Sequence, residues 1–588
     1  MKMWRKRTIF AAVIFLVGIS VLLGRLAQIQ LIDTKSFSGR NINLIRESVK
    51  QRSQEVIIDH GRGAFYDRNM EPVTHSTIPS LILFPFLKNT DWDVEKVAEI
   101  TGIPERKLLK AVDEAEEPFV FGGPRPLKLT PEQMDAINNL KIPGVFAVEI
   151  KMDKKDFPAA QLIGTVGQND REARNRYPDR GLSAGTKIGI LGLQKSFDEF
   201  LLQEEQTKLV YHVDGKGGPL FGAKVKYVDP SNPFYPLKVQ TTIDLEIQNK
   251  AEEIVDQFKI EKGGLILLDI SSNSILANVS RPKIDLDDPF QNEGAKNFMF
   301  TAQIPGSVFK TVIAAAAIEY RLISPRRIFD CNKTIHGTYD EYRHGRLDFT
   351  KSFAVSCNNT FATLATELIA LDPRIIETYA EKLGLTEETG WRGQVFHFKD
   401  FKQFSGEEKG HVYLNDEERH DRKFAAQTGI GQQSVRITPV AAANMMATIA
   451  RGGEKKMVRA VSDIRYKNGN TLFHFPEKSL GKDGISPYTA GKLQKLLREV
   501  VVYEEGTGHA LNELPYTVAG KSGTAETHRY AEDGKEYLNK WFVGYFPYEN
   551  PKYALAVVNL DVFSDEGSVI PVFQEMVEFL YEYDKSDS

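Results

Sequence analysis

Cysteine is scarce in this chain, whose 588 residues contain two, Cys331 and Cys357. So few cysteines exclude a framework of several disulfides and a metal site built on cysteine. Net charge is also small, at −4, and no basic patch with interleaved aromatic residues occurs, so nucleic acid is not expected as a partner. Long apolar runs are limited to one, at the N-terminus. A second membrane span is therefore not predicted.

The N-terminal apolar run predicts a membrane anchor. Several basic residues lie within residues 1–7, ahead of an uncharged run, 8–24. Arg25 can snorkel toward the headgroups and let the helix continue, so the predicted transmembrane anchor is 8–32. The basic residues before the span place 1–7 in the cytoplasm and the rest of the chain outside the membrane. No A-x-A-like site follows the run, which argues against a cleaved signal peptide.

Histidine offers another route to a metal site, and the polar segment 391–423 holds three. Their spacings, 14 residues from His397 to His411 and 9 from His411 to His420, fit no common zinc pattern. The glycines of 215–218 do not form a phosphate loop, because no Gly-Lys-Ser/Thr sequence closes it. We therefore expect no metal ion and no cofactor.

The length of the chain predicts two or three domains, and three prolines in 230–236 indicate a boundary. Residues 33–236 form the first predicted domain, a mixed α/β pedestal without clustered chemical groups. In the second, 237–588, strand patterns at both ends enclose helical segments, which predicts one antiparallel sheet packed by helices. The expected fold class is therefore α+β and multidomain, behind an N-terminal transmembrane helix.

One short stretch combines the residue types that acyl transfer needs. Ser307 lies three residues before Lys310, directly after a Pro-Gly turn and ahead of an apolar run that predicts a helix. Residues three apart share a helix face, so the hydroxyl and the amine can meet. Unpaired backbone N–H groups at a helix N-terminus suit a developing oxyanion. Alone, however, the S-x-x-K pattern is more typical of an ordinary helix start.

Two further motifs follow in the same predicted domain. Ser356-Cys357-Asn358 comes 49 residues after Ser307, and Lys521-Ser522-Gly523-Thr524 lies in a predicted strand, 518–526. Each motif alone is common turn chemistry. The ordered set S-x-x-K, S-x-N and K-S/T-G is typical of penicillin-binding proteins and class A β-lactamases. Together the motifs predict a serine acyl-transfer enzyme.

Over nearly its whole length the chain resembles a class B penicillin-binding protein, a peptidoglycan D,D-transpeptidase. The resemblance rests on the single anchor, the Arg-Gly-x-x-x-Asp-Arg-Asn box of 62–69, Pro-Gly-Ser-Val-Phe-Lys of 305–310 and Trp-Phe-Val-Gly of 541–544. Met70 and Gln194 depart from the family pattern, which commonly has glycine and glutamate there. The resemblance extends to proteins of endospore-forming Gram-positive bacteria, type 4B included. It implies an elongated, dimerisation-like pedestal and a β-lactamase-like transpeptidase domain.

The chemistry of the family explains the first two motifs. The resemblance implies that Ser307 attacks the D-Ala-D-Ala amide of a stem peptide, and Lys310 is expected to be the base that a serine nucleophile needs. Burial lowers the pKa of a lysine, and a second cation lowers it further; Lys521 is expected to be that cation. Ser356 is expected to relay a proton between Lys310 and the leaving amine.

The resemblance also implies how the substrate is held. Asn358 can donate to and accept from its peptide backbone. Lys521, Ser522 and Thr524 receive its terminal carboxylate, and the backbone N–H groups of Ser307 and Thr524 form the oxyanion hole. The predicted site residues are Ser307, Lys310, Ser356, Asn358, Lys521, Ser522, Gly523 and Thr524.

Cys357, the middle residue of the second motif, receives no catalytic role. Its neighbours are expected to face the site, so we expect its side chain to point into the core as a small hydrophobe. A disulfide with Cys331 stays an alternative outside the cytoplasm, because the sequence does not give Cα distances.

Other functions compete with transpeptidation. Hydrolysis, by a D,D-carboxypeptidase or a β-lactamase, is one, but no Glu-x-x-x-Asn sequence of class A β-lactamases lies between the second and third motifs. A non-catalytic scaffold of the wall-synthesis complex, or a β-lactam sensor, is the other, although a scaffold does not need all three motifs. The resemblance implies a single-pass cell-membrane protein with an extracellular catalytic domain. Its expected partners are peptidoglycan stem peptides, β-lactams as covalent inhibitors, the cytoplasmic membrane and a membrane glycan polymerase.

Overall fold

Two compact units make up the chain, and neither is one continuous run of residues. The computed structural model describes residues 2–34, 37, 43–51, 53–123, 125–180, 182, 185–202, 205–213, 226–230, 232–339, 343–481 and 483–586, so the glycines of 215–218 lie outside the described residues. The first unit comprises Met1–Gly61, Ser76–Met152 and Glu204–Pro233. The second comprises Arg62–His75, Asp153–Gln203 and Phe234–Ser588.

The N-terminal apolar run is helical. α1 (Lys2–Ala27) continues into one π-helical turn, η1 (Gln28–Ile32). Residues Met3–Ile32 are long and apolar enough to cross a membrane, and the predicted span 8–32 lies within them. Within this helix Arg25 donates a 2.8 Å hydrogen bond to Gln28, so the charge that interrupts the apolar run has a polar partner on the helix itself.

The rest of the first unit is a mixture of short helices and two three-stranded sheets. One sheet consists of β1 (Ser53–Asp59), β8 (Thr207–His212) and β9 (Lys226–Val228), and the other of β4 (Phe119–Val120), β3 (His75–Leu83) and β5 (Val145–Asp153). The helices are α2 (Leu44–Gln51), α3 (Val94–Thr101), α4 (Glu105–Glu114) and α5 (Pro131–Asn139). Apolar side chains from both sheets and from α3, α4 and α5 share one core.

A five-stranded sheet organises the second unit and confirms the predicted antiparallel sheet. Its strands follow the order β12-β11-β21-β20-β19, and every neighbouring pair is antiparallel. The strands are β11 (Gly263–Asp269), β12 (Ser274–Arg281), β19 (Ala519–Tyr530), β20 (Glu536–Phe546) and β21 (Tyr553–Val562). In chain order, β11 and β21 are the first and last strands of this sheet, and they are neighbours in it, which is why strand patterns occur toward both ends of this part of the sequence.

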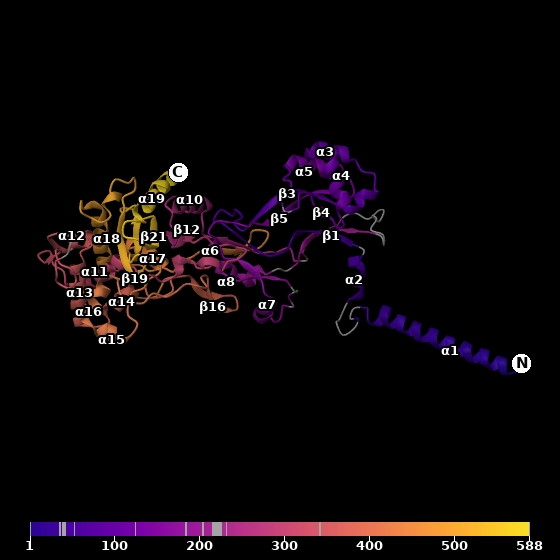
Figure 1. The fold of residues 1–588 in the computed structure, drawn as a ribbon, viewed down its shortest axis with the longest axis horizontal. Helices are drawn as coiled ribbons and strands as arrows, with labels where there is room; N and C mark the ends of the chain where they lie inside the picture. The colour runs from indigo at the N-terminus through magenta and orange to yellow at the C-terminus, as the bar shows by residue number, and fades with distance from the viewer. Residues whose placement is uncertain are drawn as a thin grey trace. The chain divides into compact units, whose positions relative to one another are not determined.

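Helices cover both faces of this sheet (Figure 1). Side chains alternate along each strand: Leu265 and Leu267 belong to one core with α10 (Leu245–Gln257) and α19 (Ile570–Ser586). Ile266 belongs to the other core, which includes α11 (Lys310–Glu319), α17 (Pro439–Ala450) and α18 (Pro487–Val502). The sheet is therefore the middle layer of three, and its strands are apolar on both faces.

A four-stranded sheet, in the order β18 (Thr471–His474), β17 (Val461–Arg465), β10 and β2, brings the Arg-Gly box of 62–69 into the second unit. β2 (Ala64–Tyr66) pairs in parallel with β10 (Lys238–Thr241). Arg62 binds the buried carboxylate of Asp198 at 2.8 Å and the amide oxygen of Gln194 at 3.0 Å. The glutamine that departs from the family pattern therefore still accepts a hydrogen bond from this arginine.

The second unit contains further helices and strands. They are α6 (Ala160–Ile163), β6 (Val166–Gln168), α7 (Asp170–Arg176), β7 (Lys187–Gly189), α8 (Gly192–Ser196), α9 (Asp198–Leu201), β13 (Ile328–Asp330), β14 (Arg346–Asp348), α12 (Phe349–Ala354), α13 (Asn358–Leu371), α14 (Ile375–Lys382), β15 (Arg392–Val395), β16 (Phe398–Lys402), α15 (Asp416–His420) and α16 (Arg422–Gly429).

Candidate active site

Ser307 lies in a 3₁₀ turn, η5 (Gly306–Phe309), and the α-helix α11 begins only at Lys310. The sequence predicted that both residues share an α-helix. In a 3₁₀ turn residues i and i+3 eclipse each other, so the serine and the lysine still lie on one side. The turn starts with Gly306 at φ +53°, a conformation that most residues adopt only with strain.

The serine turn packs against the strand that carries the third motif. A Cβ atom on Gly306 would lie 2.2 Å from the carbonyl oxygen of Thr524, and one on Gly523 would lie 2.5 Å from the carbonyl oxygen of Pro305, directly before the turn. Glycine at both positions therefore permits the approach. On the neighbouring strand, Trp541 donates from Nε1 to the carbonyl of Ile304 at 3.0 Å, which fixes the stretch before the serine.

Lys310 joins the first motif to the second. Its side chain is fully buried, and Nζ donates to the carbonyl oxygen of Ser356 at 2.6 Å, to Ser356 Oγ at 3.1 Å and to Asn358 Oδ1 at 2.6 Å. The predicted meeting of these two motifs is therefore present, although they lie 46 and 48 residues apart in sequence.

Burial is the largest influence on the pKa of Lys310. It lowers the pKa of Lys310 well below 10.5, and the charge of Lys521 lowers that pKa further. From the sequence, Lys521 was expected to be the decisive influence on Lys310, whereas in the structure its charge lowers the pKa of Lys310 less than burial does. Burial also lowers the pKa of Lys521 itself, to about 7. Lys521 is therefore only partly charged near neutral pH, which limits its effect on Lys310.

The three acceptors around Lys310 favour its charged form and so act against the lowering of its pKa, because an ammonium has three N–H groups to donate. The cost of burying a charged lysine outweighs these hydrogen bonds, because burial is the largest influence on the pKa of Lys310. A neutral amine can keep the two 2.6 Å hydrogen bonds and turn its lone pair to the longer contact, Ser356 Oγ, which then donates. Lys310 and Ser356 thus form a path along which a proton can move.

Ser356 itself has an unusual backbone. It follows α12 and has φ +60°, the left-handed conformation in which helices more often end with glycine. Its N–H donates to the carbonyl of Phe353 at 3.1 Å, and its own carbonyl accepts from Lys310. The strained conformation directs this carbonyl to the lysine, and such strain persists where the surroundings impose it.

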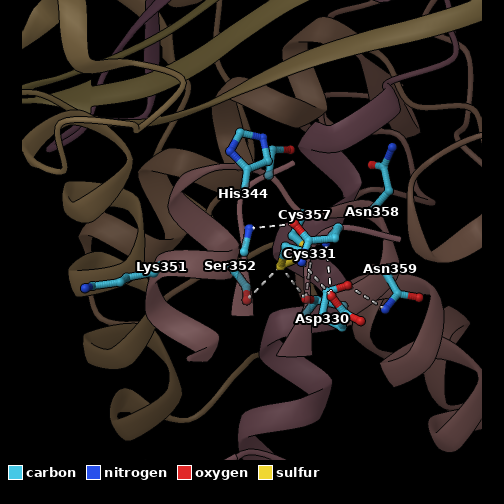
Figure 2. The surroundings of a disulfide bond; sticks show 12 residues. Asp330, Cys331, His344, Lys351, Ser352, Cys357, Asn358 and Asn359 are labelled. Carbon is cyan, nitrogen blue, oxygen red and sulfur yellow. Dashed lines mark hydrogen bonds between the residues drawn. A yellow bond between two sulfur atoms is a disulfide. The ribbon is translucent and has the colours of Figure 1, made fainter. Parts of the chain in front are cut away.

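A disulfide between Cys331 and Cys357 lies inside the second motif, with the two Cα atoms 5.6 Å apart (Figure 2). Cys357 is buried as predicted, but the alternative in which it pairs with Cys331 is the one that the structure adopts. Cys357 is also the residue before α13, and Asn358 begins that helix. In Figure 2, Asn358 points away from the disulfide. Its Oδ1 accepts from Lys310 Nζ at 2.6 Å, while Asn359 donates to the carbonyl of Asp330 at 3.1 Å.

Removal of this disulfide is expected to destabilise the second unit and to slow acylation. A cross-link that closes a loop of 26 residues typically contributes about 2–4 kcal/mol to the free energy of unfolding. We expect a Cys331→Ser, Cys357→Ser variant to lose a stability of this order in urea denaturation followed by tryptophan fluorescence. Labelling by a fluorescent penicillin should slow in parallel, because Cys357 separates Ser356 from Asn358.

Reduction of the wild-type protein provides the control for the disulfide prediction. A dithiol reductant should reproduce the loss in the wild type and leave the double variant unchanged. A double variant with the denaturation midpoint and labelling rate of the oxidised wild type would contradict the prediction.

The third motif divides between the interior and the surface. Lys521 is fully buried on β19, whereas Ser522 is half-buried and Thr524 is exposed. Residues two apart on a strand share a face, so the two hydroxyls open to solvent together. Ser522 Oγ donates to Thr507 Oγ1 at 2.8 Å. Sequence reasoning assigned no role to Thr507, although the two glycines that flank it were a signal of a constrained turn.

Comparison with known families finds two matching domains. The model of the penicillin binding protein transpeptidase domain matches residues 263–578, and that of the penicillin-binding protein dimerisation domain matches residues 57–232. The first match covers more than half of the chain and includes all three motifs.

Individual relatives match over most of their length. Peptidoglycan D,D-transpeptidase MrdA of Acinetobacter baumannii is 22% identical, over 95% of this chain and 85% of the relative. Stage V sporulation protein D of Bacillus subtilis is 23% identical, over 94% and 81%. A solved structure, described as structural coordination of polymerization and crosslinking by a peptidoglycan synthase complex, has a TM-score of 0.64 at 20% identity and covers 97% of both chains. That similarity supports the same fold.

Proposed function

The chain belongs to the penicillin-binding proteins that combine a dimerisation domain with a transpeptidase domain, and we propose that it is a class B peptidoglycan D,D-transpeptidase with Ser307 as its nucleophile. One observation carries the assignment of residues. The buried amine of Lys310, three residues after Ser307, contacts both polar residues of the second motif. A lysine in this environment is suited to accept a proton from a serine.

In the proposed first step, Ser307 Oγ attacks the carbonyl carbon between the two D-alanines, and its proton moves to Lys310 Nζ. The carbonyl oxygen becomes an oxyanion, which accepts from the backbone N–H groups of Ser307 and Thr524. The C–N bond then breaks while Ser356 passes a proton from Lys310 to the leaving amine. D-Alanine leaves, and the rest of the stem peptide stays as an ester on Ser307.

The second step repeats these events in reverse. The amine of a neighbouring stem peptide attacks the ester and loses a proton to Lys310 through Ser356. The oxyanion collapses, Ser307 leaves with a proton, and a new peptide bond joins the two stems. Asn358 binds the donor backbone, and Lys521, Ser522 and Thr524 bind its carboxylate before D-alanine leaves.

We also propose the arrangement at the membrane. Residues 1–7 lie in the cytoplasm, 8–32 span the membrane once, 33–236 form the pedestal, and 237–588 form the extracellular transpeptidase domain. The basic residues before the helix support this orientation. A membrane glycan polymerase is the proposed partner, supported by the similarity to a structure described as a synthase complex that couples polymerization to crosslinking.

A donor-exchange assay tests the proposed activity. The full chain in detergent is mixed with a stem peptide that ends in D-Ala-D-Ala and with a free D-amino acid as acceptor. We expect D-alanine release together with the exchanged peptide, and a penicillin adduct that persists for many minutes. Release of D-alanine without exchange would favour a carboxypeptidase, rapid loss of the penicillin adduct a β-lactamase, and no adduct at all a scaffold.

A further inference from the structure

Thr507 connects the strand of the third motif to the helix that precedes the second. Its hydroxyl accepts from Ser522 Oγ at 2.8 Å and donates to the carbonyl of Ala354 at 3.4 Å. Its backbone N–H donates to the same carbonyl at 3.1 Å. Ala354 is the last residue of α12, so Thr507 meets one of the carbonyls that a helix end leaves without an intrahelical partner.

The direction of these hydrogen bonds is unsuited to an anion. A hydroxyl has one proton, and a carboxylate only accepts. While Ser522 donates to Thr507, it presents lone pairs to a carboxylate that arrives from solvent. Binding therefore requires the Ser522 proton to turn outward, which leaves its oxygen without the hydrogen bond to Thr507.

We propose that Thr507 is a positioning residue for the terminal carboxylate of the donor peptide, because its hydroxyl reverses and donates to Ser522 when Ser522 donates to that carboxylate. This inference rests on the proposed function. The 3.4 Å hydrogen bond to Ala354 is the one that breaks, since it is longer than normal for two oxygens. The Ala354 carbonyl keeps the backbone N–H of Thr507, so every group stays paired after the reversal.

The location of Thr507 suits a role in positioning the carboxylate. Its side chain is exposed, as is that of Thr524, and its hydroxyl contacts Ser522 Oγ directly. The buried Lys521 adds charge behind them without occupying the surface. A hydroxyl pair in series also polarises, so that the outer donor to the carboxylate becomes stronger.

Thr507→Val, which keeps the shape and removes the hydroxyl, tests the inference in the full chain. The probes are benzylpenicillin and its carboxylate methyl ester. For the free acid we expect up to about a ten-fold loss in the second-order acylation rate, the size of one hydrogen bond between neutral groups. The loss should lie in the affinity of the first complex and spare the limiting acylation rate. The methyl ester, which is a weaker acceptor without charge, should react with both proteins alike.

Two further variants sharpen the test. Thr507→Ser keeps the hydroxyl and should restore the affinity for the free acid. In a Ser522→Ala background, Thr507→Val should cost nothing more, because the two residues act in series. Four outcomes would each overturn the inference while leaving the proposed function intact. They are equal losses with acid and ester, a loss confined to the limiting rate, a full loss on the Ser522→Ala background, and a Thr507→Val protein that reacts like the wild type. A wild-type protein that forms no adduct with the free acid would instead overturn the proposed function itself.

Discussion

Ser307→Ala is expected to lower covalent labelling of the full chain by a fluorescent penicillin by about 10⁴-fold or more, the scale seen when a serine nucleophile is removed. The reason is chemical: alanine has no oxygen to form the ester. The expected change in structure is small, because the η5 turn is held by backbone contacts of Gly306 and by Trp541 and not by the serine side chain. Gel fluorescence after a fixed time, with peptide mass mapping of the adduct, measures the effect.

A serine on the surface of the same unit provides the matched control. Ser324 is exposed and lies shortly after α11, and Ser324→Ala should label at the wild-type rate. If Ser307→Ala labels as strongly as the wild type, or if mass mapping finds the adduct on another residue, the assignment of the nucleophile is wrong.

The motifs of the site were accessible from the sequence because each is a short run with a fixed chemical purpose. The order of three such runs predicted that residues far apart would meet, and the hydrogen bonds of Lys310 to Ser356 and Asn358 confirm that contact. The sheet was accessible for a similar reason, because alternating or continuous apolar strands at both ends of a domain need partners. Strands such as β11 are apolar throughout because a layer of helices covers each face of the sheet.

Other features depend on distances that no local pattern encodes. The disulfide needs the 5.6 Å approach of Cys331 to Cys357, which goes with the packing of β13 against α12 and the start of α13. The relative weight of burial and of Lys521 on Lys310 depends on how much solvent the fold removes. Thr507 was missed because a threonine between glycines carries no chemistry until Ala354 and Ser522 lie beside it.

Acylation should depend on pH through both buried lysines. Lys310 must be neutral to accept the proton of Ser307, so the second-order rate of penicillin acylation rises as pH increases through the lowered pKa of Lys310. Lys521 must be charged to attract the carboxylate, and its pKa is about 7, so the rate falls as pH increases above that value. The expected profile is a bell whose falling limb begins near neutrality.

Lys310→Met then separates the two limbs. Methionine has a similar length without the amine, and loss of a general base typically costs about 10²–10⁴-fold in rate. We expect such a loss in the acylation rate of the full chain, together with disappearance of the rising limb, while the falling limb that belongs to Lys521 stays. Lys351→Met is the matched control, because Lys351 is an exposed lysine on α12 that points away from the disulfide (Figure 2). A Lys310→Met protein that keeps the rising limb would show that another group takes the proton of Ser307, and a wild-type profile that does not fall above neutral pH would show that the charge of Lys521 is not needed for the carboxylate.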